Sequence, residues 1–201
     1  MSRYRTRSWR AFDPGAARPS PSGAAGLKIL GLDPGSRRTG YGVIERRGVD
    51  WVHVAHGCVT VTGGADSLPE RLRVIFESLR ELIVAHGPGE VAIERVFVNR
   101  NVDSALKLGQ ARGAALCAVP KGLPVFEYAP RAIKLALVGS GAAEKVQVAH
   151  MIRTLLGLQG RIAPDAADAL AVAVCHAHSR RLQELALCAA QSARMAEAAS
   201  R

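Results

Sequence analysis

The chain has 201 residues, of which 48% are hydrophobic, and it carries a net charge of +10. This length and composition exclude a disordered chain and allow one domain with a full core, and no apolar run is long enough to cross a membrane. Residues 27–180 alone hold 19 basic and 14 acidic residues, so the body of the chain is itself basic. The charge favours a polyanionic partner, either nucleic acid or an anionic membrane, although a basic protein without such a partner explains it equally well.

The two ends and the cysteines indicate the domain organisation. Residues 1–26 hold five arginines, three prolines and one acid, without the apolar centre of a secretory signal, and are predicted to be a disordered basic arm. We expect a folded body over residues 27–180 and a helical or disordered tail over residues 181–201. The four cysteines are far apart and form no CxxC pair, which disfavours zinc or a disulfide framework and favours a reducing, cytoplasmic location.

Apolar periodicity predicts five strands and five helices. The strands cover residues 27–32, 41–45, 52–62, 91–94 and 124–128. The helices cover residues 67–86, 103–119, 129–137, 142–156 and 165–180. Short connections between the first three strands predict antiparallel hairpins, and the helical crossover before the fourth strand predicts that it runs parallel to the first. The predicted fold class is therefore α/β, a mixed five-stranded sheet with helices on both faces.

Four carboxylates stand where predicted elements meet loops. Asp33 and Glu94 follow the first and fourth strands, whose C-terminal ends lie side by side if these strands are parallel neighbours. Asp165 and Asp168 are three residues apart at the start of the last helix, so both face the same way. Four acids gathered in this way would repel one another unless metal relieved the repulsion. Hard oxygen ligands favour Mg²⁺ or Mn²⁺, and two such ions about 3.5–4 Å apart would flank one phosphate.

Most of these acids also have a simpler explanation when each is taken alone. Asp33 can shape the turn that includes Pro34, Glu94 can pair with Arg95, and Asp165 can be an ordinary helix-start residue. Asp168, one turn later, is harder to explain in this way because it faces an alanine-rich stretch. The metal hypothesis therefore depends on the acids meeting in space.

A stripe of small residues marks the second predicted helix. Ala105, Gly109 and Gly113 are spaced four apart and so lie on one face of that helix. Glycine inside a helix costs about 0.5–1 kcal/mol relative to alanine. We expect close packing against another helix backbone to offset this cost.

Five long stretches of the body share one family pattern. They are LGLDPGSRRTGYGVI (30–44), AIERVFVNRNVDSALKLGQARGAAL (92–116), LPVFEYAPRAIK (123–134), GSGAAEKVQVAHMIRTLLGL (139–158) and PDAADALAVAVCHAH (164–178). In these stretches the chain resembles the RuvC family of bacterial Holliday-junction resolvases. The similarity covers nearly all of residues 27–180 and is far more specific than any short motif.

This resemblance implies a ribonuclease-H-like fold and a homodimer whose dimer helix matches residues 103–119. It implies that Holliday junctions are resolved during recombination and repair by paired symmetric nicks that leave 5′-phosphate and 3′-hydroxyl ends. Two Mg²⁺ ions per active site are expected, with Mn²⁺ as a substitute, and the RuvA–RuvB branch-migration complex is the expected partner. The residues to which the resemblance assigns both catalysis and metal binding are Asp33, Glu94, Asp165 and Asp168.

The resemblance also implies contacts with DNA. It assigns phosphate binding to Lys134 and Lys145 and a wedge between junction bases to Phe97, and Arg100 in the polar segment that follows is a further candidate. Simpler explanations stay open for three of these side chains. Lys134 can snorkel at the surface, Lys145 can pair with Glu144, and Phe97 can belong to the core.

Two other functions compete with a nuclease. In an actin-like or sugar-kinase ATPase, a loop similar to residues 33–40 binds phosphate, but that fold needs two such domains. ATP hydrolysis without DNA would favour this alternative. A non-enzymatic junction-binding module would explain the positive charge, but the intact set of acids disfavours it.

Overall fold

The computed structural model describes residues 26–61, 67–96 and 102–199. At its centre is a five-stranded sheet with the order β3-β2-β1-β4-β5. The strands are β1 (Lys28–Asp33), β2 (Arg38–Arg47), β3 (Asp50–Thr60), β4 (Glu90–Glu94) and β5 (Val125–Tyr128). The five predicted strands and the mixed α/β fold class are thus confirmed.

The pairing of the strands brings two carboxyl ends together. β1 and β2 pair antiparallel, as do β2 and β3, whereas β1 pairs parallel with β4 and β4 pairs parallel with β5. In the β1–β4 register Leu32 lies opposite Ile93. Asp33 and Glu94, the next residue on each strand, therefore emerge at the same edge of the sheet.

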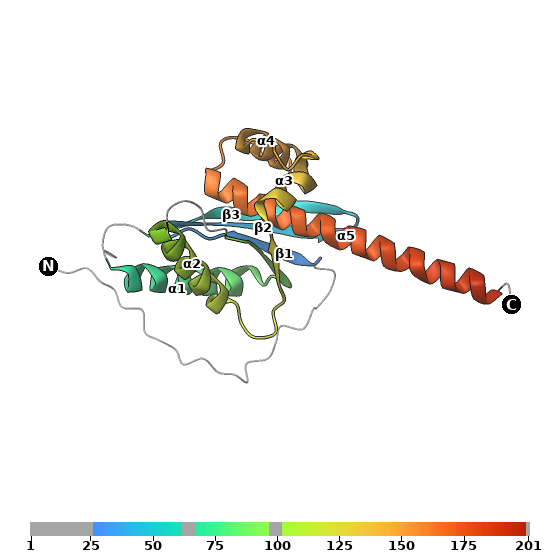
Figure 1. Cartoon of the computed structure of the whole chain (residues 1–201), viewed down its shortest axis with the longest axis horizontal. Coiled ribbons are helices and arrows are strands. Elements are labelled where there is room, and N and C mark those ends of the chain that lie inside the picture. The colour runs from blue at the N-terminus through green and yellow to red at the C-terminus, as the bar shows by residue number, and fades with distance from the viewer. Residues whose placement is uncertain (1–25, 62–66, 97–101, 200–201) are drawn as a thin grey trace.

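Helices cover both faces of this sheet (Figure 1). They are α1 (Leu68–His86), α2 (Val102–Ala118), α3 (Pro130–Val138), α4 (Lys145–Leu155) and α5 (Pro164–Ala199). α1 and α2 lie against one face, while α5 lies on the other with α3 and α4 packed onto it. A capping box of Ser67 and Glu70 opens α1, and Gly87 ends it in the left-handed region.

The alternation of side chains along β1 supplies both cores. Leu30 and Leu32 are buried in the core under α1 with Leu79, and Ile29 is buried in the core under α5 with Leu170. Successive residues of a strand point to opposite faces, so one strand contributes to both layers. Each fully buried side chain of this size stabilises the fold by about 1.5–3 kcal/mol. The central strands are therefore anchored from both sides.

Two strand glycines let α5 approach the sheet closely. A Cβ atom on Gly31 would lie 2.1 Å from the carbonyl oxygen of Ala169, and one on Gly40 would lie 1.9 Å from that of Asp165. Real Cβ atoms do not come this close to a backbone oxygen, so only glycine fits at either position. The start of α5, with its two acids, is thereby seated directly on β1 and β2.

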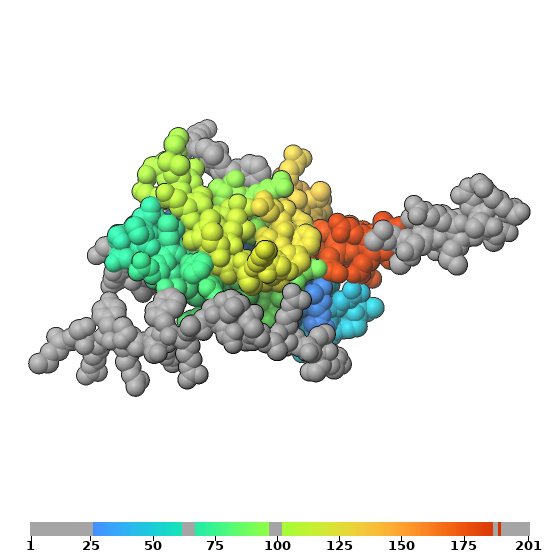
Figure 2. All heavy atoms as spheres, turned by 90° about the horizontal axis from the view of Figure 1, so that it is seen from below, coloured from blue at the N-terminus to red at the C-terminus, as the bar shows by residue number. Residues whose placement is uncertain are grey.

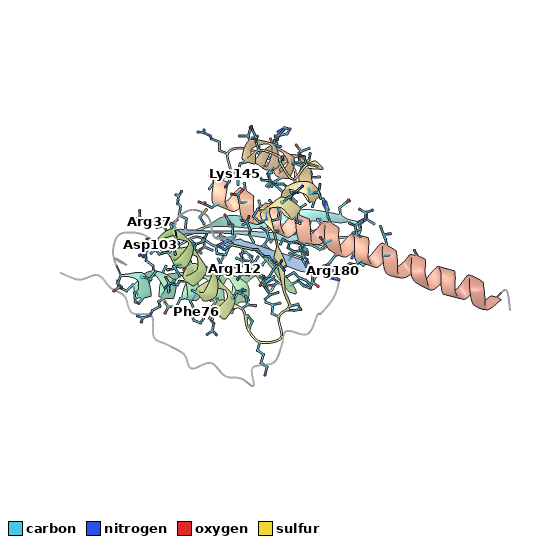
Figure 3. All side chains as sticks on the ribbon, in the orientation of Figure 1. Arg37, Phe76, Asp103, Arg112, Lys145 and Arg180 are labelled. Atoms are coloured by element: carbon cyan, nitrogen blue, oxygen red, sulfur yellow. The ribbon has the colours of Figure 1, made fainter. Side chains whose placement is uncertain are left out.

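A buried polar cluster fixes α5 farther along its length. His176 Nε2 lies 2.8 Å from Glu90 Oε2 and its Nδ1 lies 2.7 Å from the hydroxyl of Tyr128. Because a carboxylate only accepts, Nε2 donates to Glu90 and Nδ1 accepts from Tyr128. Arg180, labelled in Figure 3, donates to the other oxygen of Glu90 at 2.6 Å. These contacts tie α5 to β4 and β5 and give His176 a structural role.

Two predicted helix boundaries differ from the structure by more than one residue. α4 begins at Lys145 instead of residue 142, because Glu144 caps it together with the side chain of Gln147. α5 continues past residue 180 to Ala199. No glycine or proline follows Arg180 to stop it, and the sequence there is rich in alanine and leucine. Among the described helices, none combines the length and the apolar character that a membrane crossing needs.

Candidate metal centre

Asp33 and Glu94 form a carboxyl pair at the shared edge of β1 and β4. Their side chains are joined by a hydrogen bond, which requires that one carboxyl group carries a proton. Burial, followed by the charge of Glu94, raises the pKa of Asp33 to about 8, and burial also raises the pKa of Glu94. Without a cation, the pair therefore retains a proton near neutral pH.

Asp168 brings a third carboxylate to this pair from the first turns of α5. In addition to burial, its charge raises the pKa of both Asp33 and Glu94. Asp168 Oδ2 accepts a hydrogen bond of 2.8 Å from Lys145 Nζ, and this bond raises the pKa of the lysine. Figure 3 shows Lys145 above the beginning of α5. The positive charge of Lys134 also acts on Glu94, where it opposes the rise in pKa.

These side chains border a pocket of about 200 Å³. We call it the acid pocket. Its lining residues are Glu94, Pro130, Ile133, Lys134, Lys145, Val148, Asp168 and Ala171. Carboxylates and lysines thus converge on one hollow from β4, α3, α4 and α5.

Asp165 lies to one side of the other three acids. Its Oδ2 atom is 3.8 Å from Arg38 Nη1. It also lies near the thiol of Cys58, whose pKa is raised first by burial and then by the charges of Asp165 and Asp33. The structure therefore brings Asp33, Glu94 and Asp168 together and places Asp165 at their margin, facing an arginine.

The donor set suits a hard divalent cation. Within residues 26–61, 67–96 and 102–199, no three His, Cys, Asp or Glu side chains are close enough to hold a metal ion as they stand. Asp168 and Asp165 are instead drawn toward Lys145 and Arg38. The positive charges near Asp33 and Glu94 are nevertheless too weak to keep both carboxyl groups ionised. All the atoms that this pair could offer to a metal ion are carboxylate oxygens. Oxygen donors with uncompensated negative charge fit Mg²⁺ or Mn²⁺.

The structure decides between several of the alternatives left open by the sequence. Glu94 bonds to Asp33, while Arg95 pairs with Glu127 at 3.4 Å. Lys145 bonds to Asp168 and not to Glu144. Lys134 borders the acid pocket, as its predicted role requires. Residues 97–101 are outside the described part of the chain, so the predictions for Phe97 and Arg100 are not tested by the structure.

Gly109 and Gly113 of the small-residue stripe of α2 do not pack against any other element that the structure describes. A Cβ atom added at Gly109 or Gly113 would meet no atom within 4 Å. α2 buries its opposite side, including Ala111 and Ala115, in the core under α1. Figure 2 shows α2 at the surface on this side of the molecule. Among the described residues, nothing covers the stripe at Gly109 and Gly113, and Ala105 on the same face is half-buried.

Two side chains that support the acids were not predicted from the sequence. Arg112 on α2 donates from Nε to the carbonyl oxygen of Glu94 at 3.3 Å, and its Nη2 lies 2.8 Å from Glu127. Buried Thr39 donates to the carbonyl oxygen of Gly35 at 3.2 Å and closes the loop after Asp33. An arginine in a helix and a threonine in a strand give no signal of such a role.

The carboxyl pair is expected to make the metal-free protein less stable as the pH rises. The pKa of Asp33 is raised from 3.8 to about 8, so the folded state binds more protons than the unfolded state between these values. Stability is then lost as the pH rises through this window. We expect Asp33→Asn to raise the free energy of unfolding at pH 8 by at least about 1.4 kcal/mol, the value of one pKa unit. Denaturant unfolding in EDTA at pH 5 and pH 8 measures this difference, and an equal effect at both values would contradict it.

Comparisons with known proteins show which family the chain belongs to. Residues 29–176 match the family model described as crossover junction endodeoxyribonuclease RuvC. The protein of that name from Alkalilimnicola ehrlichii is 57% identical over 157 residues, which is 78% of this chain and 94% of the relative. T. thermophilus RuvC in complex with a Holliday junction substrate matches with a TM-score of 0.72 and 35% identity, over 78% of this chain and 96% of that one. The yeast mitochondrial Holliday junction resolvase shares the fold, with a TM-score of 0.58 and 10% identity over 79% of this chain and 84% of that one.

Proposed function

The chain belongs to the RuvC family of crossover junction endodeoxyribonucleases, and from this membership we propose that its acid pocket cuts DNA strands. The protein is a Holliday-junction resolvase, a nuclease of DNA recombination and repair. One observation carries the assignment of the site: Glu94, which is hydrogen-bonded to Asp33, lines one pocket together with Asp168 and two lysines. The family membership sets aside the ATPase and the pure binding module.

The acids would hold two Mg²⁺ ions, with Mn²⁺ as a substitute. When bound, these ions supply an activated water and stabilise the 3′ oxygen that leaves, giving a 5′-phosphate and a 3′-hydroxyl. Asp33 and Glu94 would have to lose their shared proton to act as ligands. Asp168 and Asp165, which now pair with Lys145 and Arg38, would complete the set of ligands. The half-buried pair would fix the position of the site, and the two α5 acids would close it.

The lysines bind the phosphate backbone. The side chain of Lys145 is 79% exposed even while it bonds to Asp168, so its ammonium group can reach a phosphate. Lys134 lies on the same pocket wall. Phe97 and Arg100 are proposed to contact junction bases and backbone from the segment after β4. Contacts of this kind position the strand, and the shape of the junction supplies the selectivity.

The choice of substrate tests this function. A synthetic four-way junction and a linear duplex with the same arm sequences are incubated with the protein and Mg²⁺. We expect cutting of the junction and little cutting of the duplex. Equal cutting of both substrates would contradict a junction-specific function, and ATP hydrolysis without DNA would revive the ATPase alternative.

We also propose that the chain acts as a homodimer through α2. The open face with Ala105, Gly109 and Gly113 continues into two exposed apolar side chains, Val102 at 65% and Leu106 at 62% exposure. A helix with small residues on its open face lets a second helix backbone approach closely. A dimer of this kind would carry two acid pockets, one for each of the strands that are nicked.

A bulky residue at Gly109 weakens this dimer. We expect Gly109→Leu to shift the monomer–dimer equilibrium toward monomer, because the side chain would separate the paired helices. Sedimentation velocity over a concentration series measures the shift. The matched control is Ala85→Leu, which adds bulk at an exposed position of α1. If both variants dimerise like the unaltered protein, the interface lies elsewhere.

The cellular setting is proposed from family membership and the cysteines. A RuvA–RuvB branch-migration complex is the expected partner at the junction. The described cysteines Cys58, Cys117 and Cys175 are free thiols. Free thiols of this kind fit a reducing cytoplasm.

A further inference from the structure

A second hollow of about 300 Å³ lies directly beside the acid pocket, between α4 and the start of α5. We call it the α4–α5 groove. Its lining residues are Lys145, Val146, Ala149, Arg153, Arg161, Ile162, Pro164, Ala167 and Asp168. Lys145 and Asp168 also line the acid pocket. The two hollows are therefore neighbours, and the bonded side chains of Lys145 and Asp168 form the wall between them.

The charge of the groove is positive. Three cationic side chains, Lys145, Arg153 and Arg161, line it together with a single acid, Asp168. Lys145 already neutralises that acid through a bond of 2.8 Å. Arg153 and Arg161 are exposed, and their guanidinium groups have no hydrogen-bond or ion-pair partner among the residues that the structure describes. Two arginines therefore remain available for an anion.

Part of the lining is apolar and accessible. Val146, which is 76% exposed, lines the groove together with Ile162 and Pro164. A groove that combines apolar and cationic side chains suits a nucleotide, whose sugar and base pack on the apolar side chains while its phosphates meet the cationic ones. A free inorganic anion would make no use of the apolar side chains. The composition thus favours a length of nucleic acid strand.

We propose that the α4–α5 groove binds the backbone of the cut strand next to the scissile phosphate, with Arg153 and Arg161 each contacting a flanking phosphate. The proposal rests on the cutting function of the acid pocket. Because the two hollows share a wall, a strand whose phosphate lies at the acids enters or leaves through this groove. Arg153 and Arg161 are positioning residues that hold the strand and do not touch the reacting atoms.

Salt dependence of binding tests the proposal. Junction affinity is measured over a salt series in an Asp33→Asn background, so that bound junctions stay intact. Each phosphate contact contributes about −0.9 to the slope of log affinity against log salt on duplex DNA. Arg153→Ala and Arg161→Ala should each make the slope shallower by about this amount. Arg73→Ala, an exposed arginine on α1 across the sheet, is the matched control and should leave the slope unchanged.

Neutral methylphosphonate linkages locate the contact. A methylphosphonate beside the cut site should weaken binding by the Asp33→Asn parent but not by the Arg153→Ala or Arg161→Ala variant that has already lost the contact. Lysine at either position should restore the slope, because it keeps the positive charge. Restoration would also show that a substitution at that position leaves the protein folded. In the cutting-competent protein, the alanine variants should need more protein for half-maximal cutting and should retain the rate at saturation.

Two results separate the groove from the cutting function. If the unaltered protein cuts junctions but both alanine variants match Arg73→Ala in slope and in methylphosphonate response, the groove does not bind the strand. If the unaltered protein cuts no junction although it binds one, the cutting function fails while the groove contact can still be measured. A fall in the saturating cutting rate without a change in slope would also overturn the positioning role.

Discussion

Asp33→Asn should abolish strand cutting and leave junction binding intact. The substitution removes one carboxylate from the hydrogen-bonded pair, so the remaining acids hold a divalent cation poorly. We expect the cutting rate to fall by about 10³-fold or more, as when an enzyme loses a central electrostatic element. Single-turnover cutting of a labelled junction and a binding titration on the same junction measure the two effects separately.

The control for this variant is Glu81→Gln, which neutralises an exposed carboxylate on α1, outside the acid pocket. It should cut at the unaltered rate. Tighter junction binding by Asp33→Asn would also agree with the account, because one negative charge near the phosphates is lost. Cutting by Asp33→Asn at more than a tenth of the unaltered rate would show that the reaction does not depend on this pair.

Gly40→Ala should damage both the stability and the activity of the protein. Its new Cβ atom would lie 1.9 Å from the carbonyl oxygen of Asp165, so the start of α5 must move away from β2. Overpacking of this kind costs typically about 1–3 kcal/mol. The movement also displaces Asp165 and Asp168, so we expect the cutting rate to fall more than the loss of folded protein explains. Thermal unfolding and single-turnover cutting at a temperature where the variant is folded measure both effects.

Gly57→Ala is the matched strand-glycine control. Its Cβ atom would also be crowded, at 2.7 Å from the hydroxyl of Tyr41, but that atom is the far end of a side chain that can move. We expect a smaller loss of stability and nearly unaltered cutting. Equal effects of Gly40→Ala and Gly57→Ala would mean that the close seating of α5 does not position the acids.

Local signals in the sequence were sufficient to predict the helices and strands and their order along the chain. The alternation that places Leu30 and Ile29 on opposite faces and the capping box at Ser67 depend only on neighbouring residues. The short hairpins and the helical crossover predicted the directions of the first four strands. Asp33 and Glu94 were then expected to meet if β1 and β4 were neighbours, as they are in the structure. The proximity of Asp33 and Glu94 could be predicted because the pairing of strands allows few arrangements of their ends.

Contacts between distant elements could not be predicted in the same way. The seating of α5 depends on Gly31 and Gly40, whose importance appears only when the helix backbone above them is known. The bond from Arg112 to the carbonyl oxygen of Glu94 depends on the angle of α2. Likewise, spacing along α5 grouped Asp165 with Asp168, but the position of Arg38 directs Asp165 toward the margin of the pocket.

The most direct test is to map every nick on a four-way junction whose strands are end-labelled one at a time, with Mg²⁺ present or removed by EDTA. If carboxylates from β1, β4 and α5 share divalent cations at the cut phosphate, nicks appear only with Mg²⁺. They should lie at symmetric positions on two opposing strands and be sealable by ligase. Nicks that persist in EDTA, or that fall on strands without symmetry, would contradict this.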